Sequence, residues 1–215
     1  MRREQKILIL ALWLVAGMAI VSVAAIKWAR LAEKQPTANP DAVVSNAGSE
    51  EESLPDLYPA PEFTLTDQHN QTITKSQLLG HPWICDFIFT TCADACPLMS
   101  TRMSALQNKL PPDVKLVSFT VDPLHDTPEV LAKYAQAYHA QDGRWLFLTG
   151  PVQTEDDVIR GMRLYFQPAQ GQSVIQHSQH FVLVDAKGSV REYYDSSILG
   201  ETDHLIADVQ RLLNP

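Results

Sequence analysis

Cysteine is scarce in this chain, with three in 215 residues, at positions 85, 92 and 96. So few cysteines cannot build a fold held together by disulfides, and the core must rest on buried apolar side chains. Basic residues form no cluster outside the N-terminal region, and the net charge is −8. Without a basic patch we expect no nucleic acid among the partners. Hydrophobic residues make up 45% and charged residues 20%, which argues against a wholly disordered chain.

Charged residues are absent from residues 7–26, which read ILILALWLVAGMAIVSVAAI. A helix of this length spans roughly 30 Å, the thickness of the hydrocarbon core of a bilayer. We therefore expect residues 1–34 to form a membrane anchor. Arg2, Arg3 and Lys6 precede the apolar segment and favour an N-terminus in the cytoplasm, although basic residues also follow it.

The alternative to an anchor is a cleaved signal peptide. Only poor small-residue cleavage sites occur near Ala24, and the apolar run is longer than the usual signal core. Nothing here resembles an Arg-rich and Ser-rich mitochondrial presequence. These features predict a single-pass protein of a bacterial-type inner membrane, with its soluble part on the periplasmic side.

Residues 35–56 lack apolar periodicity and are rich in Pro, Ser, Asn and acidic residues. This composition predicts a flexible linker. From residue 57 to 215 the pattern alternates between strands and helices. We expect strands at 63–66, 71–74, 83–89, 114–121, 145–148, 180–184 and 190–194, and helices at 97–110, 127–138, 155–166 and 202–213. The fold class predicted is α/β, a sandwich around a mixed central sheet.

Cys92 and Cys96 stand where a buried strand is predicted to turn into a helix, in the segment FTTCADACP at 89–97. A helix N-terminus carries partial positive charge, which favours thiolate over thiol. Thiolate is the form that attacks disulfides and binds metal, and two sulfurs at this spacing can close a disulfide or meet at one soft ion. The alternative is a pair of unreactive buried cysteines.

Two further residues lie inside the predicted strand 83–89. Cys85 is expected to belong to the core. Asp86 is less easily explained, because an unpaired buried carboxylate is costly. Its six-residue offset from Cys92 resembles that of the buried aspartate of thioredoxins, which relays protons for the cysteine pair. The sequence leaves open whether Asp86 is such a relay or a structural carboxylate.

Three segments carry a family resemblance: WICDFIFTTCADACP at 83–97, VDPLHDTPE at 121–129, and His177-Ser178 before an apolar strand. In this order they resemble the Sco/SenC family of copper-handling, thioredoxin-like, membrane-attached proteins, over residues 61–213. The resemblance implies a thioredoxin-like fold and a copper ion, Cu(I) or Cu(II), held by Cys92, Cys96 and His177. Two thiolates and one imidazole suit copper chemically. It also implies a copper-accepting subunit of cytochrome c oxidase, or another copper chaperone, as partner.

The sequence departs from the family pattern in two places. Gln176 precedes His177 where an aspartate is common, which removes an expected anchor for the imidazole. His81 stands where lysine is frequent. The second family segment contains His125, which we expect to be a solvated loop residue.

The leading hypothesis is a membrane-tethered copper chaperone. The alternative is a thiol-disulfide oxidoreductase that reduces the cysteines of a partner, with Cys92 and Cys96 as the redox pair. Thioredoxin-type enzymes typically place two residues between their cysteines and a cis-proline opposite them, whereas this chain has three intervening residues and no proline directly before His177. A third interpretation is a peroxide-reactive protein. Such proteins have a lone nucleophilic cysteine in a Pro/Thr environment, which this chain lacks.

Overall fold

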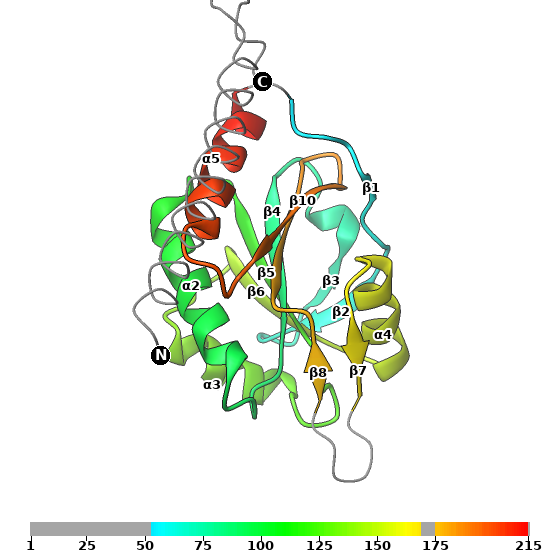
Figure 1. The fold of residues 1–215 in the computed structure, drawn as a ribbon. Helices are drawn as coiled ribbons and strands as arrows, with labels where there is room; N and C mark the ends of the chain where they lie inside the picture. The colour runs from blue at the N-terminus through cyan, green and yellow to red at the C-terminus, as the bar shows by residue number, and fades with distance from the viewer. Residues whose placement is uncertain (1–52, 169–174, 215) are drawn as a thin grey trace, which may run out of the picture. The chain divides into compact units, whose positions relative to one another are not determined.

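The computed structural model describes residues 53–168 and 175–214 (Figure 1). The predicted anchor at 1–34 lies outside the described residues, as does the predicted linker up to residue 52. Within the described ranges, no helix has the length and apolar character needed to cross a bilayer. The elements in chain order are β1 (Tyr58–Pro59), β2 (Thr64–Asp67), β3 (Thr72–Thr74), η1 (Lys75–Gln77), β4 (Trp83–Ile88), α2 (Ala95–Lys109), β5 (Lys115–Thr120), α3 (Pro128–Ala137), β6 (Trp145–Thr149), α4 (Val152–Gly161), β7 (Phe166–Gln167), β8 (Gln176–His177), β9 (His180–Val184), β10 (Ser189–Asp195) and α5 (Glu201–Leu213).

The central sheet is mixed, as predicted. Its eight strands follow the order β1-β10-β9-β4-β5-β6-β2-β3. The strands β4, β5 and β6 are parallel to one another, whereas β9 pairs antiparallel with β4. Because β4 and β5 are parallel, the loops that follow them leave the same edge of the sheet. The short strands β7 and β8 form a separate antiparallel pair.

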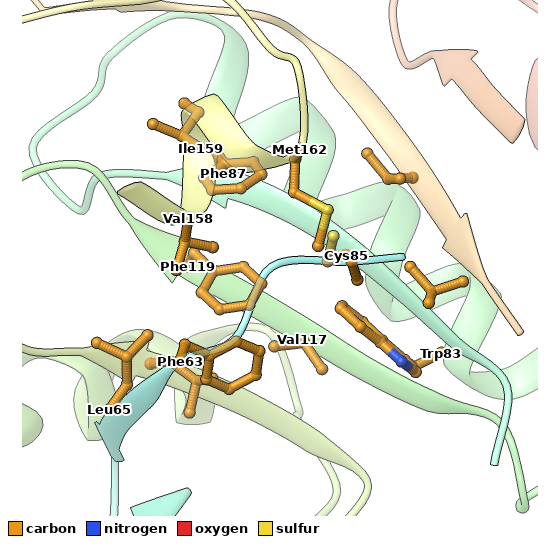
Figure 2. Packing of buried hydrophobic residues seen from close by; sticks show 14 of the residues in the cluster. Phe63, Leu65, Trp83, Cys85, Phe87, Val117, Phe119, Val158, Ile159 and Met162 are labelled. Carbon is orange, nitrogen blue, oxygen red and sulfur yellow. The ribbon is translucent and has the colours of Figure 1, made fainter. Parts of the chain in front are cut away.

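Strand β4 is buried on both sides, and its alternate residues enter two different clusters. Trp83, Cys85 and Phe87 point to the side covered by α4, which we call the α4 face. On this face Phe87 stacks on Phe119, which in turn meets the ring of Phe63 edge to face (Figure 2).

The opposite side, which we call the α2 face, is covered by α2, α3 and α5. Ile84 and Ile88 of β4 pack there against Met99 and Met103 of α2. By the same alternation Asp86, between the two isoleucines, also faces α2. Strand β4 therefore lies between two apolar cores, one containing Cys85 and the other Cys96.

Several element boundaries differ from those predicted. The helix expected at 155–166 is α4, which begins at Val152 and ends at Gly161. Arg163 then adopts a positive φ of 54°, and Phe166 enters β7, which the sequence did not predict. The start of α3 is as predicted: the Thr127 side chain accepts a hydrogen bond from the Val130 N–H at 3.4 Å, and Pro128 follows.

Candidate metal and thiol site

The loop between β4 and α2 places the two cysteines in different environments. Cys92 follows a turn in which its N–H donates to the Phe89 carbonyl at 3.2 Å, and its side chain is partly exposed. Cys96 lies in the first turn of α2, which begins at Ala95, and its side chain is fully buried. Both cysteines are free thiols. The side chain of Cys92 is thus accessible to solvent, whereas that of Cys96 is not.

Burial dominates the electrostatics of Cys96. The loss of water raises the pKa of the Cys96 thiol far above its usual value, and the neighbouring Cys92 thiol raises it further. The predicted preference for thiolate therefore does not hold for Cys96 in the metal-free protein, because burial disfavours the charged form of its thiol. A bound metal or a proton acceptor is needed to convert the Cys96 thiol into a thiolate.

His177 reaches the cysteines from a distant part of the chain. It lies in β8, where it pairs with Phe166 of β7. Its Nε2 atom is 3.5 Å from the Sγ atom of Cys96, 81 residues away in sequence. The ring of Phe89 meets the imidazole edge to face at 5.9 Å between centroids. The structure thus brings two of the three predicted ligands into contact.

The orientation of the imidazole is set by a backbone carbonyl. Nδ1 of His177 lies 3.0 Å from the carbonyl oxygen of Ser178, which can only accept, so the hydrogen is on Nδ1. Nε2 then turns a lone pair toward Cys96. Burial lowers the pKa of His177, which favours the neutral ring that a metal requires. Gln176 lacks the carboxylate that we expected to anchor the imidazole, and the carbonyl of Ser178 anchors it instead.

Cys92 and His177 line one open pocket. Within the described ranges no three His, Cys, Asp or Glu side chains are grouped closely enough to hold a metal. The two cysteines and His177 nonetheless fit copper by their donor atoms. The pocket is lined by Phe89, Thr91, Cys92, Ala93, Asp94, Ala95, Tyr165, Ile175, Gln176, His177 and Gln179.

Asp86 lies fully buried on the α2 face, the face that also contains Cys96. Its Oδ1 accepts a hydrogen bond from the Ser118 hydroxyl at 2.6 Å, and the Trp145 indole N–H donates to that hydroxyl at 3.0 Å. Its Oδ2 atom has no hydrogen-bond partner among the described residues. Burial raises the pKa of Asp86 to about 7, against the lowering effect of Ser118. Asp86 also raises the pKa of Cys96, so the two groups interact electrostatically.

Cys85 lies on the α4 face, where burial raises the pKa of its thiol well above the usual value. It is a core residue, as expected. The third cysteine is therefore separated from the pair by the strand itself.

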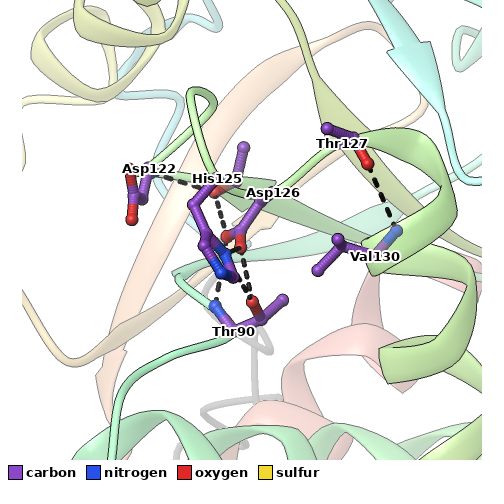
Figure 3. Close-up of polar contacts among 7 residues, drawn as sticks. Thr90, Asp122, His125, Asp126, Thr127 and Val130 are labelled. Carbon is purple, nitrogen blue, oxygen red and sulfur yellow. Dashed lines mark hydrogen bonds and ion pairs between the residues drawn. The ribbon is translucent and has the colours of Figure 1, made fainter.

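Sequence reasoning missed a network centred on Asp126, in the loop after β5 (Figure 3). The fully buried carboxylate accepts hydrogen bonds from the Thr90 N–H at 3.1 Å and the Thr120 hydroxyl at 2.6 Å. The Thr90 hydroxyl also donates to it, at 2.5 Å, and His125 Nδ1 lies 3.0 Å away. This carboxylate ties the loop after β5 to the segment that leads to Cys92. The motif VDPLHDTPE contains Asp126, but nothing in it indicates that Thr90 and Thr120 are the hydrogen-bond partners of this carboxylate.

Comparison with known proteins places the chain among copper-handling relatives. The SCO1/SenC family model matches residues 53–214. A SCO1 protein homolog of Bacillus subtilis is 34% identical over 158 residues, which are 71% of this chain and 82% of that protein.

Two solved structures share the fold. BsSco, a member of the Sco family of cytochrome c oxidase assembly proteins in which a disulfide switch has been identified, is 32% identical with a TM-score of 0.66, over 75% of this chain and 98% of that one. Yeast Sco1, solved with copper bound, is 27% identical with a TM-score of 0.57, over 73% of this chain and 90% of that one. These likenesses support the thioredoxin-like α/β fold.

Proposed function

The chain belongs to the SCO1/SenC family, and on this premise we propose that it is a membrane-tethered copper chaperone. The observation that carries the proposal is the contact between Cys96 Sγ and His177 Nε2 at 3.5 Å, with Cys92 in the same pocket as His177. Cys92, Cys96 and His177 would hold one copper ion, which is the cargo of the protein. Two soft sulfurs favour Cu(I), and the imidazole accommodates either oxidation state.

The different exposure of the two cysteines suits transfer. Cys96 is fully buried, whereas Cys92 is partly exposed at the pocket wall. A partner's ligand would therefore meet copper from the Cys92 side. We propose a copper-accepting subunit of cytochrome c oxidase, or another copper chaperone, as that partner; the relative BsSco belongs to a family of cytochrome c oxidase assembly proteins.

The predicted anchor at 1–34 would hold this domain on the periplasmic side of a bacterial-type inner membrane. A C-terminal fusion to alkaline phosphatase, which folds only outside the cytoplasm, tests the orientation. An active fusion supports the proposal, and an inactive but intact fusion contradicts it. The mass of the purified N-terminus distinguishes an anchor from a cleaved signal peptide.

Copper titration of the reduced full-length protein tests the ligand set. We expect one copper ion per chain, and a sharp loss of affinity in each of Cys92→Ser, Cys96→Ser and His177→Ala. His69→Ala is a matched control, because His69 lies in the turn between β2 and β3 and bonds Asp142 instead of a cysteine. An unchanged affinity in His177→Ala would remove the imidazole from the set.

A second candidate function, thiol-disulfide exchange, is favoured by Oδ2 of Asp86, which has no hydrogen-bond partner among the described residues and lies on the face that holds Cys96. Cys92 as thiolate would attack a partner's disulfide, forming a mixed disulfide and releasing one partner thiolate. Cys96, after losing its proton to Asp86, would attack the Cys92 sulfur and release the second partner thiolate. The partner gains two electrons and the Cys92–Cys96 pair becomes a disulfide.

Insulin reduction distinguishes the two functions. Rapid turnover that persists in His177→Ala supports the oxidoreductase, since that reaction needs only the cysteine pair. Slow turnover together with tight copper binding in the wild-type protein supports the chaperone.

A further inference from the structure

His125 is held in one orientation by the carboxylate network of Asp126. Its Nδ1 lies 3.0 Å from Oδ1 of Asp126, whose side chain is fully buried. The other partners of this carboxylate are an N–H group and two hydroxyls that donate to it (Figure 3). The carboxylate thus acts as an acceptor throughout, which places the hydrogen on Nδ1 of His125 and leaves a lone pair on Nε2 of the neutral ring.

The imidazole of His125 lies at the surface and is half-exposed to solvent. The side chain is 52% exposed, and the preceding Leu124 is 85% exposed, so this part of the loop projects into solvent. An imidazole whose one nitrogen is bonded to a carboxylate while the other is open is the arrangement that proteins use to orient metal-binding histidines. His177 shows a similar arrangement, with Nδ1 tied to a carbonyl and Nε2 toward Cys96.

His125 contacts the segment that leads into the thiol site. Its Nδ1 is 3.4 Å from the hydroxyl oxygen of Thr90. Thr90 is two residues before Cys92, a stretch of chain that spans at most about 7 Å. The network of Asp126 thus ties a half-exposed imidazole to the segment that leads to the partly exposed Cys92.

We propose that His125 is an outer copper ligand, which binds incoming copper through Nε2 and passes it to Cys92. This inference rests on the proposed copper function. With only one side chain contributed by this chain, binding at His125 is transient and occurs while the copper donor still supplies other ligands. The step is a ligand exchange without a change in oxidation state: a copper–nitrogen bond is replaced by a copper–sulfur bond, and the Cys92 thiol releases its proton to solvent.

The test compares rates with affinities in the full-length, reduced, metal-free protein. Cu(I) is presented as its coloured bicinchoninate complex at mildly alkaline pH, and loss of colour gives both the rate and the equilibrium of transfer. His125→Asn is the informative variant, because its amide can still donate to Asp126 but lacks the outer nitrogen. His69→Asn is the control, because His69 also bonds a carboxylate, that of Asp142, in the turn between β2 and β3.

We expect His125→Asn to slow transfer roughly tenfold, within the range over which association rates vary among variants of one site. Its final copper affinity should equal that of the wild-type protein, and His69→Asn should change neither quantity. A wild-type rate in His125→Asn, or an equal loss of rate and affinity, would overturn the proposal. If the wild-type protein itself takes no copper from the complex, the proposed function fails and not merely this step.

Discussion

The two faces of strand β4 are equally buried, and each packs one cysteine into an apolar cluster. On the α4 face Trp83, Cys85 and Phe87 join an apolar cluster that contains one cysteine and several aromatic rings. On the α2 face Asp86 and Cys96 lie among apolar side chains. Burial therefore does not distinguish Cys96, the proposed copper ligand, from the core residue Cys85. What separates them is that Cys96 has an imidazole at 3.5 Å and a partly exposed cysteine in the preceding turn.

The largest effect on stability is expected for Phe87→Ala on the α4 face. The fully buried ring stacks on Phe119 at 5.3 Å, and its removal should lower the free energy of unfolding by about 4 kcal/mol. Denaturant unfolding measures the loss. Copper affinity of the folded variant should remain that of the wild-type protein, and a large drop would show that the two faces are not independent.

Asp86→Asn should change the pH dependence of stability. The pKa of Asp86 is raised from 3.8 to about 7 by folding, so its neutral form is the one that the fold accepts. Its contribution is fully present below pH 3.8 and is lost as the pH rises to about 7, a cost of up to roughly 4 kcal/mol. The amide that replaces the carboxyl group in the variant cannot ionise, so the stability gain over wild type should grow across this window and then level off.

Unfolding curves at several pH values measure this difference. A gain that is independent of pH would contradict the assignment of the titration to Asp86. Ser118→Ala is the companion variant: it removes the hydrogen bond to Oδ1 and should shift the window to higher pH, because that bond lowers the pKa.

Glu155 provides the corresponding test on the α4 face. It shares one side of α4 with Val158 and Ile159, and neither carboxylate oxygen has a partner among the described residues. Burial raises the pKa of Glu155 well above its usual value. Glu155→Leu should raise the free energy of unfolding at neutral pH by about 2 kcal/mol.

The exposed Asp157 on the same helix is the matched control for Glu155. Asp157→Leu should change the free energy of unfolding by less than about 0.5 kcal/mol. Equal effects of the two leucine substitutions would show that helix propensity, and not the buried carboxyl group, explains the gain.

Among the buried positions, the smallest effect is expected for Cys85→Ala. The substitution removes one sulfur from a well-packed core and should cost about 1 kcal/mol of unfolding free energy. The copper stoichiometry and affinity should not change, in contrast to Cys96→Ser. A loss of bound copper in Cys85→Ala would contradict the separation of the two faces by β4.

Local patterns predicted seven of the eight strands of the central sheet and the α-helices, because burial leaves a hydrophobic pattern in each segment, whereas the two-residue strand β1 was missed. The continuous apolar run at 83–89 predicted β4, and the position of Cys92 and Cys96 after it followed directly. The early end of α4 was not predictable, because the pairing of Phe166 with His177 is a contact between distant segments. The same pairing positions His177, so local sequence alone did not place the imidazole, and the family resemblance supplied it.

The effects of burial on side-chain pKa values and polar contacts could not be predicted from the sequence either. The helix N-terminus predicted an acidic thiol at Cys96, whereas the depth of the side chain determines the direction of its pKa. The role of Asp126 depends on Thr90 and Thr120, which the fold brings together from the ends of two parallel strands. Such polar networks leave no periodic signal in the chain.

X-ray absorption at the copper edge of the loaded full-length protein tests the central claim most directly. With Cys92, Cys96 and His177 as ligands, the spectrum should show two sulfur neighbours and one imidazole nitrogen, and the nitrogen should disappear in His177→Ala. A first shell without sulfur, or an imidazole signal that survives in His177→Ala, would contradict the account.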